Sequence, residues 1–285
     1  MKDFRGKTAF VTGGASGIGL SMARAFGRQG MNVVLADIDA NAAADAAEKL
    51  ASEQIKATPV VCDVSERGKV QEAALEVIAE FGKIHVVCNN AGVGAGGPVG
   101  TVKESDWDWI IDVNLKGVVY GVETFLPLIK SHGEGGHFVN TASMAGMMSP
   151  PGMEPYSATK FAVVAMSEGW AAQLQPMGIG VSVLCPGFVR TRIFESRRNR
   201  QQKYGGSADG GDLASDESGA AAAQMIQSGI DPDIVGARVV EAVRDGELYI
   251  FTHPEYRDAV ETRFAAIRAA FESAAKSAAL KTPKA

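Results

Sequence analysis

The chain has 285 residues and a formal net charge of -5, from 28 basic and 33 acidic residues, which excludes the strongly basic surface that binds nucleic acid or an anionic membrane. Hydrophobic residues make up 46% and charged residues 21%, so the composition is that of a globular protein with a substantial core. No run approaches the ~20 apolar residues of a membrane span and the start has no apolar signal core, so we expect a cytoplasmic protein without a membrane partner.

The first elements predict a phosphate-binding turn. Residues 7–12 are a short apolar run typical of a strand, and a glycine-rich turn from Gly13 to Gly19 follows before a helical pattern begins. Strand, glycine turn and helix start in this order direct backbone N–H groups and the helix N-terminus toward an anion. The spacing is G-x-x-x-G-x-G and not the dinucleotide fingerprint G-x-G-x-x-G, so the turn alone does not establish nucleotide binding.

The second predicted strand, residues 32–36, ends at Asp37. A carboxylate at this place accepts hydrogen bonds from an adenosine ribose and repels a 2′-phosphate. Asp37 could instead cap the next helix, a position that Asp39 or Asn41 can also take. No Arg or Lys stands at 14–16 or at 38 to hold a 2′-phosphate, so the sequence favours NAD over NADP.

Strand and helix patterns continue to alternate. Residues 58–64 form a strand pattern that ends at Asp63, residues 70–82 an amphipathic helix, and residues 84–92 a buried strand that breaks at Asn89. The apolar runs are continuous, as in parallel strands covered on both faces. We therefore predict an α/β fold: a doubly wound, mainly parallel, seven-stranded Rossmann-type sheet with helices on both faces.

A long helical stretch from about residue 104 to 130 has Asn114 in its middle. Because an Asn amide competes for backbone hydrogen bonds, we expect a local kink there. Trp107 and Trp109 near its start are expected to be core or interface residues. Residues 136–142 then form a strand that ends at Ser143, at the edge where open α/β sheets bind ligands.

Tyr156 and Lys160 are four residues apart on the next predicted helix, which continues to about residue 177. This spacing stacks their side chains on one helix face. A nearby ammonium favours the phenolate and lowers the pKa of a phenol, so the pair fits a proton-transfer role. A packed ring beneath a solvated amine explains the same spacing, and only the accompanying motifs favour chemistry.

The last third of the chain contains a strand at 179–184 and a polar, glycine-rich, aperiodic segment from 192 to 228. We predict that this segment is a mobile substrate lid, with a disordered surface insertion as the alternative. Residues 248–254 indicate a final strand. The helical extension at 254–285 carries Phe264, Ile267 and Phe271 on one face, which would cover the core or a subunit contact, and the terminal KTPKA should fray. We find no linker that divides residues 1–285 into two domains.

The cysteines and histidines give no indication of a metal site. The three cysteines have no C-x-x-C spacing, and we predict that they are reduced core thiols: Cys62, Cys88 and Cys185. The four histidines are scattered along the chain: His85, His132, His137 and His253. We predict no metal ligand among them.

Motifs that are individually common occur here together and in one order. They are TGGASGIG at 12–19, NNAG at 89–92, Ser143, and Tyr156 followed by Lys160. With this set the chain resembles the short-chain dehydrogenase/reductase family, single-domain type, over residues 5–252. The resemblance implies an oxidoreductase that transfers hydride between a nicotinamide cofactor and an alcohol or ketone.

The resemblance also implies four catalytic roles. Tyr156 would take the proton from an alcohol or return it to a ketone. Lys160 would lower the pKa of Tyr156 and bind the nicotinamide ribose. Ser143 would hydrogen-bond the substrate oxygen, and Asn114 would hold a water that links Lys160 to solvent.

The same resemblance assigns the cofactor contacts. The expected cofactor-binding residues are Gly13, Ser16, Gly17, Ile18, Gly19, Asp37, Asp63, Val64, Asn90, Ala91, Gly92, Tyr156, Lys160, Pro186, Gly187, Val189 and Thr191. Residues 13–19 would border the pyrophosphate and adenosine ribose, and Asp63 and Val64 the adenine. Residues 90–92 would line the cofactor cleft, and Val189 and Thr191 would contact the carboxamide.

A narrower likeness concerns the substrate. The segments DFRGKTAFVTGGASG, WDWIIDVNL, KYG and ELYIFTHPEYRDAVETRF are similar to those of the Cα-dehydrogenases that oxidise lignin-derived aryl glycerol ethers. The predicted lid does not align well with theirs, so the likeness implies a substrate class only. Four methionines between Ser143 and Tyr156 fit a pliable apolar pocket wall or ordinary packing: Met144, Met147, Met148 and Met153.

We therefore predict an NAD-dependent dehydrogenase that interconverts a bulky hydrophobic, aryl-substituted secondary alcohol and its ketone. The resemblance implies a homodimer or homotetramer. One alternative is an NADPH-dependent ketoreductase for fatty-acyl, polyketide or steroid carbonyls, against which Asp37 argues. Another is a non-catalytic nucleotide-sensing protein of the same fold, against which the presence of Ser143, Tyr156 and Lys160 argues.

Overall fold

The computed structural model describes residues 1–207 and 217–280. The chain divides into two compact units, Met1–Thr252 and His253–Ala285. The middle of the predicted lid, residues 208–216, and the terminal KTPKA lie outside the described residues. No helix among the described residues combines the length and apolar character that a membrane span requires.

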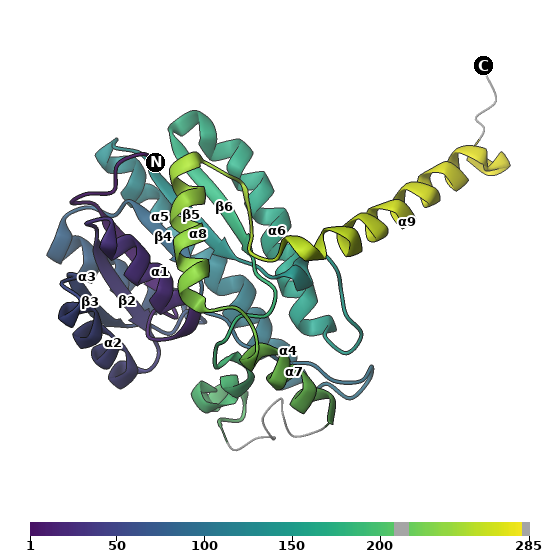
Figure 1. Ribbon diagram of the computed structural model, residues 1–285, viewed down its shortest axis with the longest axis horizontal. Coiled ribbons are helices and arrows are strands. Elements are labelled where there is room, and N and C mark those ends of the chain that lie inside the picture. The colour runs from purple at the N-terminus through teal and green to yellow at the C-terminus, as the bar shows by residue number, and fades with distance from the viewer. Residues whose placement is uncertain (208–216, 281–285) are drawn as a thin grey trace. The chain divides into compact units, whose positions relative to one another are not determined.

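A parallel sheet of seven strands forms the centre of the first unit (Figure 1). In spatial order its strands are β3 (Ala57–Val61), β2 (Asn32–Asp37), β1 (Thr8–Thr12), β4 (Val86–Asn89), β5 (Gly136–Thr141), β6 (Ile179–Cys185) and β7 (Tyr249–Phe251). The strand order reverses between β1 and β4, and such a switch point is where open sheets bind ligands. The sheet confirms the predicted doubly wound α/β fold.

Helices cover both faces of this sheet. One face carries α1 (Gly17–Arg28), α2 (Ala40–Ser52) and α8 (Pro232–Asp245). The other carries α3 (Arg67–Phe81), α4 (Glu104–Ile111), α5 (Gly117–His132) and α6 (Glu154–Leu174). Each face has its own apolar core, since the buried strand side chains alternate between the two. In the second core the rings of Phe10 and Phe125 lie 4.5 Å apart.

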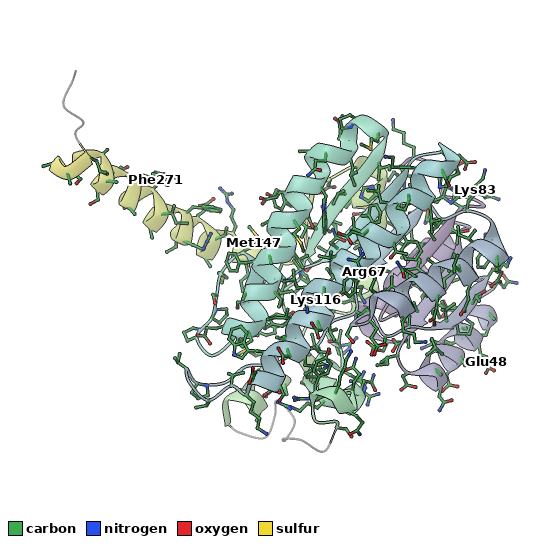
Figure 2. All side chains as sticks on the ribbon, turned by 180° about the vertical axis from the view of Figure 1, so that it is seen from behind. Glu48, Arg67, Lys83, Lys116, Met147 and Phe271 are labelled. Atoms are coloured by element: carbon green, nitrogen blue, oxygen red, sulfur yellow. The ribbon has the colours of Figure 1, made fainter. Side chains whose placement is uncertain are left out.

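Three features differ from the predictions. β3 ends at Val61, so Asp63 follows the strand instead of closing it. The stretch expected as one helix with a kink is α4, a π-helical turn at Asp112–Lys116, and α5. Figure 2 shows Lys116, at the end of this turn, on the side of the sheet that α5 and α6 cover. The sequence analysis did not predict α8.

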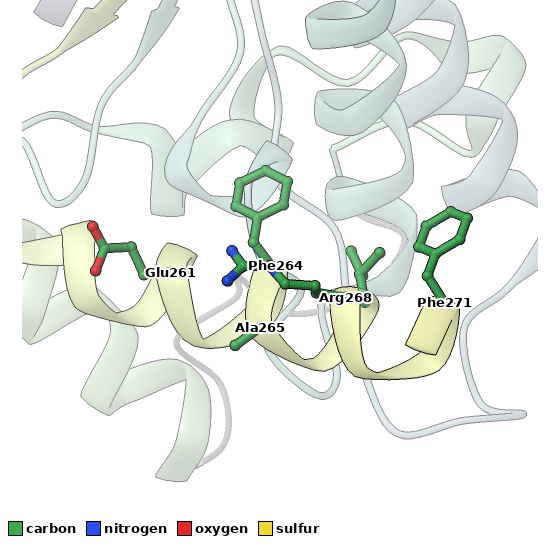
Figure 3. Close-up of a pocket in the computed structure, with 6 residues that line it drawn as sticks. Glu261, Phe264, Ala265, Arg268 and Phe271 are labelled. Atoms are coloured by element: carbon green, nitrogen blue, oxygen red, sulfur yellow. The ribbon is translucent and has the colours of Figure 1, made fainter. Parts of the chain in front are cut away.

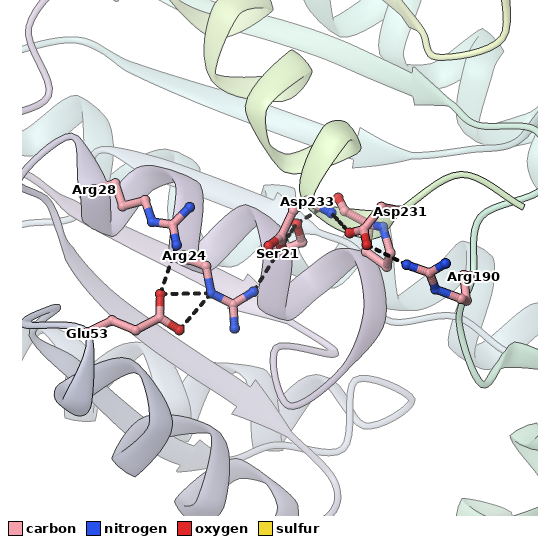
Figure 4. Close-up of polar contacts among 8 residues, drawn as sticks. Ser21, Arg24, Arg28, Glu53, Arg190, Asp231 and Asp233 are labelled. Atoms are coloured by element: carbon pink, nitrogen blue, oxygen red, sulfur yellow. Dashed lines mark hydrogen bonds and ion pairs between the residues drawn. The ribbon is translucent and has the colours of Figure 1, made fainter.

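Ion pairs and hydrogen bonds join α8 to α1 (Figure 4). The Ser21 hydroxyl donates to Pro232 O over 2.6 Å, and Arg24 Nη1 lies 2.9 Å from Asp233 Oδ1. Arg24 also pairs with Glu53 over 3.0 Å. Its side chain is 10% exposed, so these pairs are better shielded than surface ones. They hold α1, the helix that follows the glycine turn, against α8.

The second unit, described by itself, contains α9 (Arg257–Lys276) between two short 3₁₀ turns, Pro254–Tyr256 and Ala278–Leu280. None of the α9 residues is buried. Phe264, Ile267 and Phe271 lie along one side of the helix with Glu261 and Arg268, as Figure 3 shows. The predicted apolar face is therefore present and exposed.

Candidate active site

The first two turns of α6 present Tyr156 and Lys160 at the carboxyl edge of the sheet. Pro155 occupies the start of this helix, where no intrahelical N–H bond is required. The Lys160 ammonium is buried, donates to Thr141 O over 2.8 Å, and lies 5.4 Å from the centre of the Tyr156 ring. The predicted pair thus shares one helix face, and β5 holds the amine through its last residue.

Burial controls the titration of both groups. It raises the pKa of Tyr156, and a hydrogen bond with Ser143 opposes the rise. Burial also lowers the pKa of Lys160 to about 8. Burial therefore outweighs the opposing hydrogen bond at Tyr156, and the lowering of its pKa by Lys160 stays a prediction. The amine itself becomes a group that titrates near physiological pH.

Ser143 follows β5 and caps a short 3₁₀ turn, Met144–Gly146. Its Oγ accepts a hydrogen bond from Ala145 N over 3.1 Å, which holds the hydroxyl on the Tyr156 side of the turn. Of the methionines that follow, Met144 is buried, Met147 lies half-buried beside α6 (Figure 2), and Met153 is exposed. This spread of burial is compatible both with a pocket wall and with ordinary packing of the methionines.

Asn114 lies fully buried in the π-helical turn. Its side-chain amide pairs with the peptide of Val93: Oδ1 accepts from Val93 N over 2.8 Å, and Nδ2 donates to Val93 O over 2.9 Å. Only a side chain with both an acceptor and a donor can form this pair, which explains Asn in place of Asp. The pair fixes the loop that follows β4. The water-holding role of Asn114 stays a prediction.

Glycines shape the turn between β1 and α1. A Cβ on Gly19 would lie 2.1 Å from Gly13 O, and a Cβ on Gly17 would lie 3.0 Å from the Thr191 methyl group. Gly13 and Gly17 also have positive φ. The first N–H groups of α1 have no partner within the helix, and the Ser16 side chain does not cap them. Free N–H groups at a helix start suit an anion, and the contact of residues 13–19 with a pyrophosphate stays a prediction.

The loop after β4 is joined to this turn. Thr12 Oγ1 accepts hydrogen bonds from Asn90 N over 2.8 Å and Ala91 N over 3.0 Å, and Asn90 Nδ2 donates to Thr12 O over 2.9 Å. Gly92 lies close to Lys160 and Asn114. A Cβ added to Gly92 would lie 3.6 Å from Lys160 Nζ and 3.4 Å from Asn114 Oδ1. The structure thus gathers residues 90–92 between the glycine turn and the catalytic side chains.

The two carboxylates predicted to contact the adenosine half of a dinucleotide lie at the carboxyl end of β2 and just after β3. Asp37 Oδ2 accepts from Ala15 N in the glycine turn over 3.1 Å, and Oδ1 accepts from Asp39 N over 3.1 Å. Burial raises the pKa of Asp37. Asp39 caps α2 through Ala42 N, so Asp37 is not needed for that purpose. Asp63 lies beside Asp37 at the same edge, because Cys62 N donates to Asp37 O.

The loop after β6 lies beside both the Ser143 turn and the glycine turn. Pro186 O accepts from Met144 N over 2.9 Å, which joins this loop to the Ser143 turn. Val189 is buried and pairs with Ile230, and Thr191 contacts Gly17. Gly187 lies between these anchors in the chain. The residues predicted to contact the carboxamide therefore lie in a fixed loop, and the contact itself stays a prediction.

Residues 192–206, which we name the strap, are the first described part of the predicted lid. They contain two 3₁₀ segments, Ile193–Asn199 and Gln202–Tyr204, and the role of residues 192–228 as a mobile lid stays a prediction. Arg200 is buried against Asp106, Gly94 N donates to Ser196 Oγ over 3.2 Å, and the Tyr204 hydroxyl donates to Asp112 over 2.6 Å. Buried polar pairs of this kind hold the strap against α4. After the strap, α7 (Glu217–Gln227) follows the undescribed residues.

The sequence analysis missed the arginines of the strap. Arg198 lies within electrostatic range of Asp37 and Asp39, which favour its charge, while burial and the neighbouring Arg192 lower its pKa. Arg198 Nη1 donates to Arg192 O and Glu195 O over 3.1 Å each. No periodicity or local spacing could have indicated that a residue this far along the chain faces Asp37.

Two of the histidines that are far apart in the sequence lie close together in the structure. His85, His132 and Glu134 lie together at the amino-terminal edge of the sheet, with ligand atoms within 4.8 Å of one another. Their ring nitrogens already have partners. His85 Nδ1 accepts from Thr8 N and Nε2 contacts Glu134, while His132 Nε2 donates to Ile84 O and Nδ1 accepts from Glu134 N. A cation there would have to displace these hydrogen bonds.

The fold and this site define a Rossmann-type oxidoreductase that uses a nicotinamide cofactor. The family model described as short chain dehydrogenase matches residues 7–202. The chain belongs to the short-chain dehydrogenase/reductase family. This membership confirms the resemblance that the motifs indicated.

Three comparisons describe its neighbourhood in the family. The chain is 40% identical over 268 residues to the C alpha-dehydrogenase of Sphingobium sp. strain SYK-6, covering 94% of this chain and 87% of that protein. It is 33% identical over 267 residues to a CLA biosynthesis dehydrogenase/reductase of Lactiplantibacillus plantarum, covering 92% and 93%. A short chain dehydrogenase/reductase from Burkholderia phymatum, solved in complex with NAD, superposes with a TM-score of 0.89 at 37% identity, covering 94% and 96%.

Proposed function

We propose that the protein is an NAD-dependent dehydrogenase that interconverts a bulky hydrophobic, aryl-substituted secondary alcohol and its ketone. The observation that carries the proposal is the convergence of Tyr156, Lys160 and Ser143 beside a glycine cradle. The likeness to the C alpha-dehydrogenase supports the substrate class. The likeness to a structure that contains NAD supports the cofactor.

The residues of this chain would divide the work as follows. A bound nicotinamide supplies the acceptor or donor of a hydride. Ser143 hydrogen-bonds the substrate oxygen and fixes the reacting carbon beside the cofactor. In oxidation, Tyr156 as its phenolate would take the hydroxyl proton as the hydride leaves the carbon, and in reduction the Tyr156 phenol would return the proton. Lys160, held by Thr141 O, places a positive charge near the Tyr156 oxygen below its pKa of about 8.

The cofactor preference rests on Asp37. Its carboxylate is held by the glycine turn and would repel a 2′-phosphate while accepting hydrogen bonds from ribose hydroxyls. Arg198 supports the alternative, because a guanidinium near Asp37 could pair with the phosphate of NADP. That alternative is an NADPH-dependent ketoreductase of the same family.

The experiment that tests the proposal measures the nicotinamide absorbance with a panel of aryl and aliphatic secondary alcohols, in parallel with NAD⁺ and NADP⁺. We expect turnover of the bulky aryl alcohols with NAD⁺. Turnover with NADP⁺ alone would contradict the Asp37 argument and favour the reductase. Binding of NAD⁺ without turnover of any member of the panel would leave the nucleotide-sensing alternative.

We also propose that the protein assembles as a homodimer or homotetramer. The exposed side chains of Phe264 and Phe271, 48% and 74% accessible, support a contact between copies through α9 (Figure 3). Light scattering after size-exclusion chromatography tests this, with the double variant Phe264→Ser/Phe271→Ser beside the wild type. A wild-type protein that runs as a monomer would contradict it.

A further inference from the structure

Gln201 of the strap contacts Asp63, the carboxylate that we expect to bind adenine. Its Nε2 donates to both carboxylate oxygens of Asp63, at 2.9 Å each. Its Oε1 accepts from Trp109 Nε1 over 3.1 Å. An indole N–H can only donate, so it fixes the amide with its oxygen toward Trp109 and its NH₂ group toward Asp63.

The position of Gln201 is fixed by its neighbour in the chain. The Arg200 side chain has no exposed surface and pairs with Asp106. Its Nε donates to Tyr204 O over 2.9 Å, its Nη2 donates to Ser105 Oγ over 3.0 Å, and its guanidinium lies 5.1 Å from the Trp109 ring centre. A buried charge with this many partners is held firmly, because each alternative position would leave it unpaired. Gln201 is therefore presented to Asp63 by a rigid support.

The contacts of Asp63 leave one acceptor position open. Oδ1 accepts from Ser65 N over 2.9 Å, from Ser65 Oγ over 2.7 Å, and from Gln201, whereas Gln201 is the described donor to Oδ2. A carboxylate offers about two acceptor directions on each oxygen. Ser65 and Gln201 are uncharged donors, so they orient the carboxylate without neutralising it. Oδ2 keeps a free direction for a further N–H donor.

We propose that Gln201, oriented by Trp109, is a positioning residue for adenine: it turns Asp63 so that Oδ2 accepts a hydrogen bond from the exocyclic amine of the dinucleotide. This inference rests on the proposed NAD-dependent function and on the adenine role of Asp63. Gln201 lies 138 residues from Asp63 in the sequence, so the inference adds a distant residue to the recognition of adenine. It also gives the strap a purpose at the cofactor, separate from any contact with substrate.

The test compares NAD⁺ with nicotinamide hypoxanthine dinucleotide, in which a carbonyl oxygen replaces the adenine amine. An oxygen acceptor facing the Asp63 carboxylate loses a charge-assisted hydrogen bond, so we expect the wild type to bind the analogue about tenfold more weakly. The measurement is the ratio of the two Kd values by isothermal titration. We expect Gln201→Leu to narrow this ratio to about twofold, because Asp63 is then free to turn away.

Two further variants complete the design. Trp109→Phe keeps an aromatic ring beneath Arg200 but removes the indole N–H, and we expect it to narrow the ratio to a lesser extent. Lys203→Gln changes an exposed strap residue that pairs with Glu66, and we expect it to keep the wild-type ratio. Thermal unfolding of each variant identifies any loss of folding.

The outcomes separate the two levels of the argument. A Gln201→Leu protein that binds both dinucleotides more weakly but keeps the wild-type ratio would show a merely structural role and overturn the inference alone. A wild-type protein without discrimination between the dinucleotides would also overturn it. A wild type that binds neither NAD⁺ nor the analogue would overturn the proposed function, and the inference with it.

Discussion

The polar side chains at the two edges of the parallel sheet differ in how many of their hydrogen-bonding groups have partners. At the amino-terminal edge, both ring nitrogens of His85 and of His132 have hydrogen-bond partners. At the carboxyl edge, the buried Lys160 ammonium has three N–H groups and one described acceptor, Thr141 O. A satisfied network stabilises a fold, whereas a buried group with spare donors and a shifted pKa is available for a ligand.

Replacing Tyr156 with Phe should have the largest effect on turnover. The change removes the group that moves the proton and keeps the ring, so we expect kcat to fall by about 10²- to 10⁴-fold while the Kd for NAD⁺ changes less than about twofold. Tyr120→Phe, on α5 beneath Arg67, is the matched control and should keep wild-type turnover. Single-turnover kinetics and titration separate the two quantities. If Tyr156→Phe kept wild-type turnover, the proposed role of Tyr156 in proton transfer would be wrong.

Replacing Lys160 with Met should lower kcat by about 10²-fold and stabilise the protein at pH 7. The folded pKa of about 8 lies below the ordinary 10.5, so below pH 8 the fold carries a buried charge that the unfolded chain solvates. That penalty disappears as pH rises from 8 toward 10.5. Urea unfolding should therefore show a gain for Lys160→Met that shrinks over this window. Lys130→Met, on exposed α5 surface, should show no such pH dependence.

Replacing Gly19 with Ala tests the cradle. The added Cβ would meet Gly13 O at 2.1 Å and Asn90 Nδ2 at 2.7 Å, so the turn must shift. We expect the Kd for NAD⁺ to rise by at least about tenfold and the free energy of unfolding to fall by about 1–3 kcal/mol. Gly68→Ala, on α3 with no atom within 4 Å of its Cβ, should instead gain about 0.5–1 kcal/mol. If Gly19→Ala and Gly68→Ala changed the free energy of unfolding and the Kd for NAD⁺ alike, the tight packing of Gly19 against Gly13 O would be refuted.

The sequence contained most of the fold and the catalytic pair because both depend on local patterns. Continuous apolar runs indicate buried parallel strands, and the four-residue spacing of Tyr156 and Lys160 places them on one helix face. The family motifs supplied the other two candidate catalytic positions, Asn114 and Ser143. The packing of α6 and β5 at the sheet edge then follows from the fold.

The strap and the histidine cluster could not be predicted in the same way. Gln201 meets Asp63 across 138 residues, and His85 meets Glu134 across 49. Such pairs depend on where separate elements come together, and they have no signature in hydrophobic periodicity. The glycine-rich composition that follows the strap in sequence indicated a loop, and nothing in it indicated which strap residues would be buried against α4.

Replacing His137 should leave turnover unchanged and should reduce the loss of folding stability in acid. Its Nε2 donates to Ser182 Oγ over 2.8 Å, and the Ser182 hydroxyl donates to Glu247 O. Its Nδ1 faces Gly180, where an added Cβ would lie 2.3 Å away. Burial, with a smaller contribution from the N-terminal charge, therefore lowers the pKa of His137 to about 3 from 6.5.

The consequence for stability has a definite sign. Between pH 6.5 and 3 the unfolded chain takes up a proton at His137 that the folded protein does not, so stability is lost as pH falls through this window. We expect the wild type to lose a few kcal/mol, roughly, over this range through this residue. His137→Gln keeps an amide donor for Ser182 and should flatten the pH dependence of urea unfolding, with kcat near pH 7 unchanged. An equally steep loss in this variant would mean that carboxylates alone cause the acid sensitivity of the fold.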